Sequence, residues 1–156
     1  AGVSVPTAYQ HASSKDQLLL EALMSLGERS ADNVRTRPPR GDTAAERHSA
    51  VFARILRGAE EKPLLYQALY RGYVASAADL GGLAEAEGLP GFGPERAAWI
   101  GETIRTGTTD HTEEEIESAA RMLSMMFLGA MIGVASGRDP DEVSGILTEA
   151  TRRLLP

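Results

Sequence analysis

The stretch A-G-V-S-V-P-T-A-Y-Q-H-A-S-S-K-D-Q-L-L, residues 1–19, decides how this chain is interpreted. Ser4 is a helix N-cap, because its hydroxyl can accept a backbone N–H that lacks an intrahelical partner. Pro6 is tolerated in the first turn, where the N–H that it lacks would be unpaired in any case. Ser14 and Gln17 have the spacing of a capping box. The stretch therefore predicts a very short helix followed by the capped start of a longer one.

The short helix carries side chains with the reach to contact nucleic acid. Thr7, Tyr9 and His11 are hydrogen-bonding residues, and Lys15 stands where the N-terminus of the next helix could face the same phosphate. On residue type alone, packing or solvated roles for the tyrosine and the histidine stay open.

The order A-G-V-S-x-x-T-x-Y-x-H-x-x-S-K-x-x-L-L resembles the recognition region of TetR-family transcriptional regulators. The resemblance implies that Thr7, Tyr9 and His11 lie on a recognition helix that touches phosphates or bases. It also implies that Lys15 contacts a phosphate from the next helix, which Leu18 and Leu19 hold against the DNA-binding head.

Two features depart from the family pattern. The family usually has Phe directly after the histidine, and the Ala12 found here removes about 2–4 kcal/mol of burial from a small head. A helix-turn-helix also needs a first helix to support the reading helix, and this sequence starts at Ala1 without one. We therefore expect the N-terminal helices to be missing from the chain, and we expect these residues alone not to bind operator DNA.

Length and composition are consistent with one ordinary domain and a partial head. The chain has 156 residues, enough to bury about 70% of its unfolded surface. We assign residues 1–20 to a partial helix-turn-helix region and residues 21–156 to a helical domain for ligand binding and dimerisation. The absence of cysteine excludes disulfides and thiolate metal sites, and it is compatible with the cytoplasmic location that we expect.

Charge is unevenly distributed along the chain. Residues 1–40 hold five Lys/Arg and four Asp/Glu, net +1, whereas residues 41–156 hold eleven and eighteen, net −7, which together give −6. Because phosphate neutralisation requires clustered cations, the acidic body is excluded as a general nucleic-acid binder. Any DNA contact is therefore confined to the N-terminal end.

Apolar residues recur at helical spacing along almost the whole chain, which predicts an all-α fold. The first long helix runs from Ser14 to about Thr36, and residues 35–41 then read as a solvated loop. Residues 77–94 are rich in Gly, Ala and Pro and predict a mobile connector. Further helix starts are indicated at Thr43, Pro63, Pro94, Thr112 and Asp139.

Aromatic and methionine side chains leave two interpretations open. Tyr66, Tyr70 and Tyr73, three and four residues apart, are either core residues or the wall of a pocket beside the connector. Methionines at helical spacing are likewise plain core or an adaptable pocket lining. Under the pocket interpretation, the expected lining is Phe52, Tyr66, Leu69, Tyr70, Trp99, Met122, Met126 and Phe127.

The segment between Arg121 and Arg138 carries no charge. Its apolar run is shorter than the roughly twenty residues that cross a membrane, so we expect no membrane partner. A helix that is apolar all round needs cover on every side, and glycines spaced by four allow a second helix to approach. Together with the last helix, this apolar segment predicts a two-fold, four-helix homodimer interface. We expect this interface to contain Gly129, Ile132, Gly133, Ile146, Ala150 and Arg153.

The C-terminal plan is similar to that of TetR-family effector domains. The segment K-P-L-L-Y-Q-A-L-Y-R-G-Y-V-A-S, residues 62–76, and the chain's ending are also similar to the KstR-like, steroid-responsive branch. The resemblance implies a dimeric transcriptional repressor, released from operator DNA by a small apolar effector such as a sterol breakdown product or an acyl thioester. The effector would shift the relative orientation of two heads, with the helix from Ser14 to about Thr36 as the lever.

Two other classes of protein fit the sequence less well. A helical ligand-binding or dimerisation protein without DNA-binding function stays open as the alternative. An enzyme is not expected, because the sequence offers no nucleophile and base that can be placed together and no Gly-rich phosphate loop. His11, His48 and His111 lie far apart in the sequence, and helix capping accounts for the carboxylates after Thr112, so we expect no metal and no cofactor.

Overall fold

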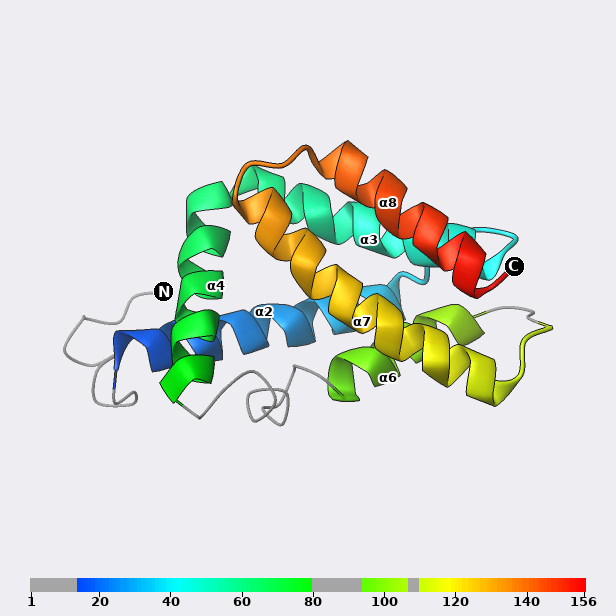
Figure 1. Ribbon diagram of the computed structural model, residues 1–156, viewed down its shortest axis with the longest axis horizontal. Helices are drawn as coiled ribbons and strands as arrows, with labels where there is room; N and C mark the ends of the chain where they lie inside the picture. Colours follow the sequence, from blue (N-terminus) through cyan, green and yellow to red (C-terminus); the bar gives the residue numbers. More distant parts are fainter. Residues whose placement is uncertain (1–13, 80–93, 107–109) are drawn as a thin grey trace.

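A computed structural model describes residues 14–79, 94–106 and 110–156, and these residues form six α-helices and no strand. The predicted all-α fold is confirmed. The helices are α2 (Lys15–Thr36), α3 (Ala44–Glu61), α4 (Pro63–Asp79), α6 (Pro94–Arg105), α7 (Glu113–Ala135) and α8 (Pro140–Leu154). In Figure 1, α7 runs diagonally across the molecule, with α4 at one end, α6 near the other and α2 behind it.

Helix starts follow the capping signals of the sequence. Thr43 and Thr112 each accept the N–H of a glutamate three residues later, and that glutamate accepts the N–H of the threonine in return. Asp139 accepts the N–H of Asp141, with Pro140 as the first residue of α8. Each of these bonds pairs a backbone N–H that the helix itself leaves unpaired, so the predicted starts are confirmed to within a residue.

The central helix is α7, which packs against α3, α4, α6 and α8. The uncharged run between Arg121 and Arg138 is shorter than a membrane span, as expected, whereas the whole helix has 23 residues and is long and apolar enough to cross a membrane by length and composition. The helix begins nine residues before that run, which is about two and a half turns. Packing against four neighbouring helices is the arrangement of a core helix in a helical domain.

The apolar side chains of α4 are only partly buried. Leu64 and Leu65 in its first turn are 78% and 44% exposed, whereas Leu69, Tyr70 and Tyr73 are buried. The first turn lies at the end of α4 away from α2 (Figure 1), so the buried face begins only with the later turns. The helix extends to Asp79, three residues into the segment expected to be a connector. The rest of that segment, residues 80–93, lies outside the described residues.

Candidate functional site

A cavity of about 440 Å³ lies among five helices. This volume falls within the range of small-molecule sites. The lining residues come from α2, α3, α4, α6 and α7: Leu23, Leu26, Gly27, Glu28, Ser30, Ala31, Asp32, Arg35, Ile55, Tyr66, Tyr70, Arg96, Trp99, Phe127, Leu128 and Met131. Most of these side chains are aliphatic or aromatic, so the wall suits an apolar ligand.

The structure brings together half of the residues that the sequence proposed for a pocket. Tyr66, Tyr70, Trp99 and Phe127 line the cavity, although α4, α6 and α7 contribute them from distant parts of the chain. Phe52 is buried and stacks on Phe127, with ring centroids 4.5 Å apart, but it does not line the cavity.

The other three expected lining residues lie elsewhere. Leu69 is completely buried in the core. Met122 and Met126 are 45% and 37% exposed and belong to the outer face of α7. They are replaced in the cavity by Leu128 and Met131, which α7 presents on its inner side together with Phe127.

A buried cation lies in this largely apolar wall. Arg96 on α6 is only 8% exposed, and its Nε donates to Ser124 Oγ on α7 at 2.7 Å. Burial raises the pKa of Tyr70 on α4, while the positive charge of Arg96 acts in the opposite direction. The Tyr70 hydroxyl therefore stays protonated at neutral pH and can donate a hydrogen bond.

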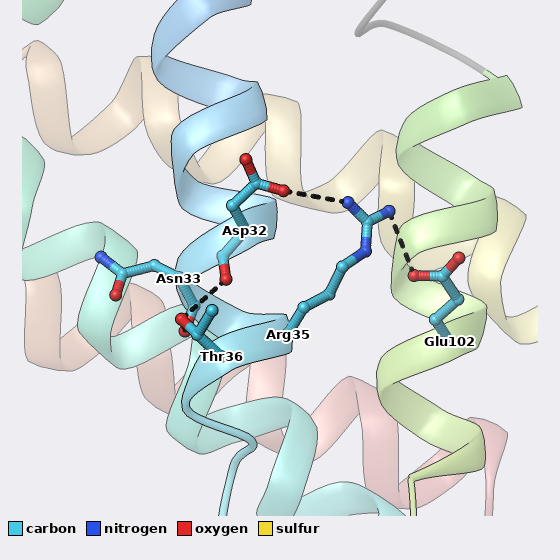
Figure 2. Close-up of polar contacts among 5 residues, drawn as sticks. All are labelled: Asp32, Asn33, Arg35, Thr36 and Glu102. Carbon is cyan, nitrogen blue, oxygen red and sulfur yellow. Dashed lines mark hydrogen bonds and ion pairs between the residues drawn. The ribbon is translucent and has the colours of Figure 1, made fainter.

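Polar residues mark the rim of the cavity between α2 and α6. Arg35, in the last turn of α2, reaches to Asp32 Oδ1 at 3.3 Å and across to Glu102 Oε2 on α6 at 3.4 Å. Figure 2 shows this bridge, together with the Thr36 hydroxyl that donates to the carbonyl oxygens of Asp32 and Asn33. Arg35 was expected in a solvated loop, but it lies in the helix and lines the cavity.

The sequence did not single out Arg96 or its buried partner Ser124 as site residues. Arg96 precedes Trp99 and Ile100 by three and four residues, so it shares their face of α6. Ser124 is the polar residue inside an otherwise apolar run. Both features can be recognised in the sequence, but an arginine on an apolar helix face is ordinarily expected to point to solvent.

The outer face of α7 is apolar and uncovered by the described residues. Met122, Met125 and Met126 are 45%, 58% and 37% exposed, and Ile146 on neighbouring α8 is 49% exposed. Gly129 belongs to the same stripe, and a Cβ built on it would meet nothing within 4 Å. We call these five residues the α7–α8 face. The expected cover of this face by a second subunit stays a prediction.

The residues predicted for a dimer interface are partly on this face. Gly129 and Ile146 are exposed members of it, while Ile132, Gly133 and Ala150 are half-buried beside it. Arg153 is exposed near the end of α8, where its Nε lies 2.7 Å from Glu149 Oε1.

Of the DNA-binding residues expected from the sequence, the structure describes only Lys15. Thr7, Tyr9 and His11 lie outside the described residues. Lys15 is the first residue of α2 and is exposed, and Ser14 caps this helix by accepting the N–H of Gln17 at 3.1 Å. Among the described residues, no group of three or more His, Asp or Glu side chains could hold a metal ion.

Comparisons with known proteins support the fold. No family model matches the sequence, and no curated protein matches it. The chain is similar to the crystal structure of a TetR transcriptional regulator from Rhodococcus sp. RHA1, with a TM-score of 0.68, 19% sequence identity, and coverage of 99% of this chain and 79% of that chain. The chain therefore has a TetR-like fold.

Proposed function

From this TetR-like fold we propose that the chain belongs to a ligand-responsive, dimeric transcriptional repressor. Residues 1–20 form part of its DNA-binding region, and residues 21–156 form its effector-binding and dimerisation domain. A small apolar effector, sterol-derived or an acyl thioester, enters the cavity and releases the protein from operator DNA. No enzymatic step is part of the proposal.

The observation that carries the proposal is the position of α2. This helix starts at Lys15, directly after the stretch that resembles a recognition region, and its later turns supply the cavity wall from Leu23 to Arg35. A helix of 22 residues is about 33 Å long and moves as a rigid rod. A ligand that displaces its cavity end therefore also shifts the end that adjoins the DNA-binding region.

Dimerisation supplies the second part of the mechanism. Two heads must meet successive half-sites about 34 Å apart, so their spacing has to be held by a symmetric interface. The residues of the α7–α8 face are apolar and exposed, and covering them with a second copy would bury the exposed side of α7. A ligand then favours one head spacing by the difference between its affinities for the two states.

Trp99 makes ligand binding directly measurable, because it is the single tryptophan of the chain and lines the cavity. We expect apolar candidates such as cholestenone to change its fluorescence in a saturable way. The full gene product should shift DNA from upstream of its own gene in a gel, and a ligand that saturates the fluorescence change should reverse this shift.

A cavity-filling variant separates ligand binding from DNA binding. Ala31→Phe, on the cavity side of α2, should abolish the fluorescence response and leave the gel shift in place. Ala22→Phe is the matched control, because Ala22 is an exposed residue of the same helix and does not line the cavity. Ligand binding without any gel shift by the full gene product would favour the alternative, a binding protein without DNA function.

A further inference from the structure

We propose that the effector carries an uncharged acceptor oxygen, such as that of a ketone, and that the hydroxyl of Tyr70 on α4 donates a hydrogen bond to this oxygen inside the cavity. The inference rests on the proposed function of the cavity as a site for an apolar ligand. It adds one polar contact, at a defined residue, to a ligand otherwise described by its apolar body.

Two tyrosines of α4 line the cavity one helical turn apart. Tyr66 and Tyr70 are separated by four residues, so they share one face of the helix, and both belong to the cavity wall. Tyr66 is partly buried, whereas Tyr70 is only 8% exposed. Tyr70 therefore lies in the more enclosed part of the wall, and Tyr66 lies nearer to solvent.

The Tyr70 hydroxyl makes no hydrogen bond within the part of the chain that the structure describes. A buried tyrosine hydroxyl normally has a partner. Burial raises the pKa of Tyr70, so the group keeps its proton and can donate it to an acceptor. Because Tyr70 lines the cavity, that acceptor can come from a molecule bound there.

A ligand oxygen suits this position better than a water molecule. An ordered water in a protein interior needs two to four polar partners, and most side chains of this wall are aliphatic or aromatic. A ketone oxygen needs only the tyrosine, because the rest of the ligand packs against the apolar wall. Such an oxygen can replace the hydrogen bond of a weakly held water.

The other neutral side-chain donors among the described lining residues are engaged or enclosed. Ser30 Oγ on α2 donates to the carbonyl oxygen of Leu26 at 2.9 Å. Trp99 lines the cavity, but its Nε1 is enclosed by protein atoms, where a ligand does not reach it. The two tyrosine hydroxyls remain. A phenol donates more strongly than it accepts, because its oxygen lone pair is delocalised into the ring, so the ligand should supply the acceptor.

The test compares two ketones with hydrocarbons of nearly the same shape. Cyclododecanone and cholestenone are titrated against the protein beside methylenecyclododecane and cholestene, with Trp99 fluorescence as the readout. In each hydrocarbon a CH₂ group occupies the place of the ketone oxygen or of the whole carbonyl. Within each pair the apolar body is therefore the same, and only the ketone accepts a hydrogen bond.

The variant Tyr70→Phe removes the hydroxyl and keeps the ring. We expect the affinity of both ketones to fall about fivefold or more, because their oxygen is then buried without a partner. The affinity of the hydrocarbons should stay within about twofold. The difference between the two changes isolates the contact between the ligand oxygen and the tyrosine hydroxyl, as in a double-mutant cycle.

Tyr66→Phe is the matched control. It makes the same change on the same helix, and Tyr66 also lines the cavity, but its hydroxyl lies nearer to solvent, where water competes as a partner. Ketone affinity should change by less than about twofold in this variant. Loss of ketone affinity in Tyr66→Phe alone would overturn the assignment to Tyr70.

A second measurement excludes a purely structural role of the hydroxyl. Since Tyr70 makes no hydrogen bond within the described residues, Tyr70→Phe should unfold in urea at the same midpoint as Tyr66→Phe when no ligand is present. A Tyr70→Phe variant that does not fold, or that unfolds at clearly lower urea, would show that the hydroxyl has a partner in the protein and would overturn the proposal.

The outcomes separate this inference from the proposed function. A ketone and its hydrocarbon that weaken by the same factor in Tyr70→Phe would overturn the hydrogen bond, while the ligand cavity stands. The absence of a saturable response of the parent protein to any of the four compounds would overturn both proposals.

Discussion

Gly72 of α4 lies so close to Leu19 of α2 that a Cβ built on the glycine would be 2.6 Å from the Cβ of Leu19. The same Cβ would lie 3.2 Å from the carbonyl oxygen of Asp16. Real Cβ atoms do not approach one another so closely, so the contact between α2 and α4 depends on the missing side chain. This contact holds the first turns of α2, next to Lys15, against the body of the domain.

Gly72→Ala should therefore force the two helices apart. We expect a loss of about 1–3 kcal/mol in the free energy of unfolding, typical of overpacking, measured by urea denaturation. Gly58→Ala is the control, because Gly58 is also helical and its Cβ would meet nothing within 4 Å. That change should stabilise the protein by about 0.5–1 kcal/mol through helix propensity. Equal effects of the two changes would show that the α2–α4 contact is not tight.

A buried histidine should make stability depend on pH. Thr151 Oγ1 donates to the carbonyl of Leu147 at 2.8 Å, so the contact of 2.9 Å between His48 Nδ1 and Thr151 Oγ1 requires the histidine to donate. His48 Nε2 is buried and has no hydrogen-bond partner among the described residues. Burial lowers the pKa of His48 to about 3. The folded state thus keeps this imidazole neutral, with the proton on Nδ1.

The sign of the pH effect follows from these two pKa values. In the unfolded chain His48 takes up a proton below its ordinary pKa of 6.5, whereas in the folded protein it stays neutral down to about pH 3. The unfolded state binds more protons in this window, so stability falls as the pH falls, by up to about 1.4 kcal/mol per pH unit. Between pH 6.5 and 4.5 the carboxylates with lowered pKa contribute little, because their ordinary pKa is 4.5.

His48→Asn should remove this contribution while keeping an N–H donor for Thr151. Urea denaturation at pH 6.5, 5.5 and 4.5 should give a shallower decline of stability for the variant than for the parent protein. The variant is expected to be less stable throughout because it leaves a cavity, so the slopes are compared and not the absolute values. Parallel curves for the two proteins would contradict a neutral, buried His48.

The α7–α8 face should control the oligomeric state. Met125→Glu places a charge at its most exposed methionine, and we expect the dimer dissociation constant to rise at least tenfold, which is about 1.4 kcal/mol. Leu64→Glu is the control, because Leu64 is even more exposed but lies on α4. Analytical ultracentrifugation over a range of protein concentrations measures both. A parent protein that stays monomeric at all concentrations would refute the dimer, as would a dimer that is insensitive to Met125→Glu.

The ion pair at the cavity rim should contribute little to stability. The side chains of Arg35 and Glu102 are 57% and 54% exposed, so water screens their attraction. A double-mutant cycle with Arg35→Met and Glu102→Gln should give a coupling energy between about 0 and 1 kcal/mol, reduced further in 0.5 M salt. A coupling above about 2 kcal/mol would mean that α2 and α6 are held together far more rigidly than the contacts in Figure 2 imply.

Local signals in the sequence predicted the helix starts well. The threonines that cap α3 and α7 and the Asp139-Pro140 pair before α8 act on backbone groups within three residues, so tertiary contacts are not needed to recognise them. Tyr66, Tyr70, Trp99 and Phe127 were also identified as cavity residues. Their large aromatic surfaces favour walls and cores in any arrangement of the helices.

Other site residues were not predictable in this way. Met122, Met126, Leu128 and Met131 are all apolar residues of α7, and a helix that is apolar all round has no periodicity that distinguishes an inner from an outer face. Arg96 was overlooked because arginine is rarely buried. In both cases the neighbouring helices decide the environment of the side chain.

The amino-acid order by itself determined the all-α class, the helix starts and the position of α2 directly after the stretch that resembles a recognition region. These features depend on backbone capping and on spacing within single helices. Only the tertiary structure decided that five helices line one cavity, that Arg96 and Tyr70 both belong to its wall, and that Met125 faces outward. Such relationships depend on how helices distant in sequence pack. The spacing of apolar residues within one helix does not specify which other helices lie against it.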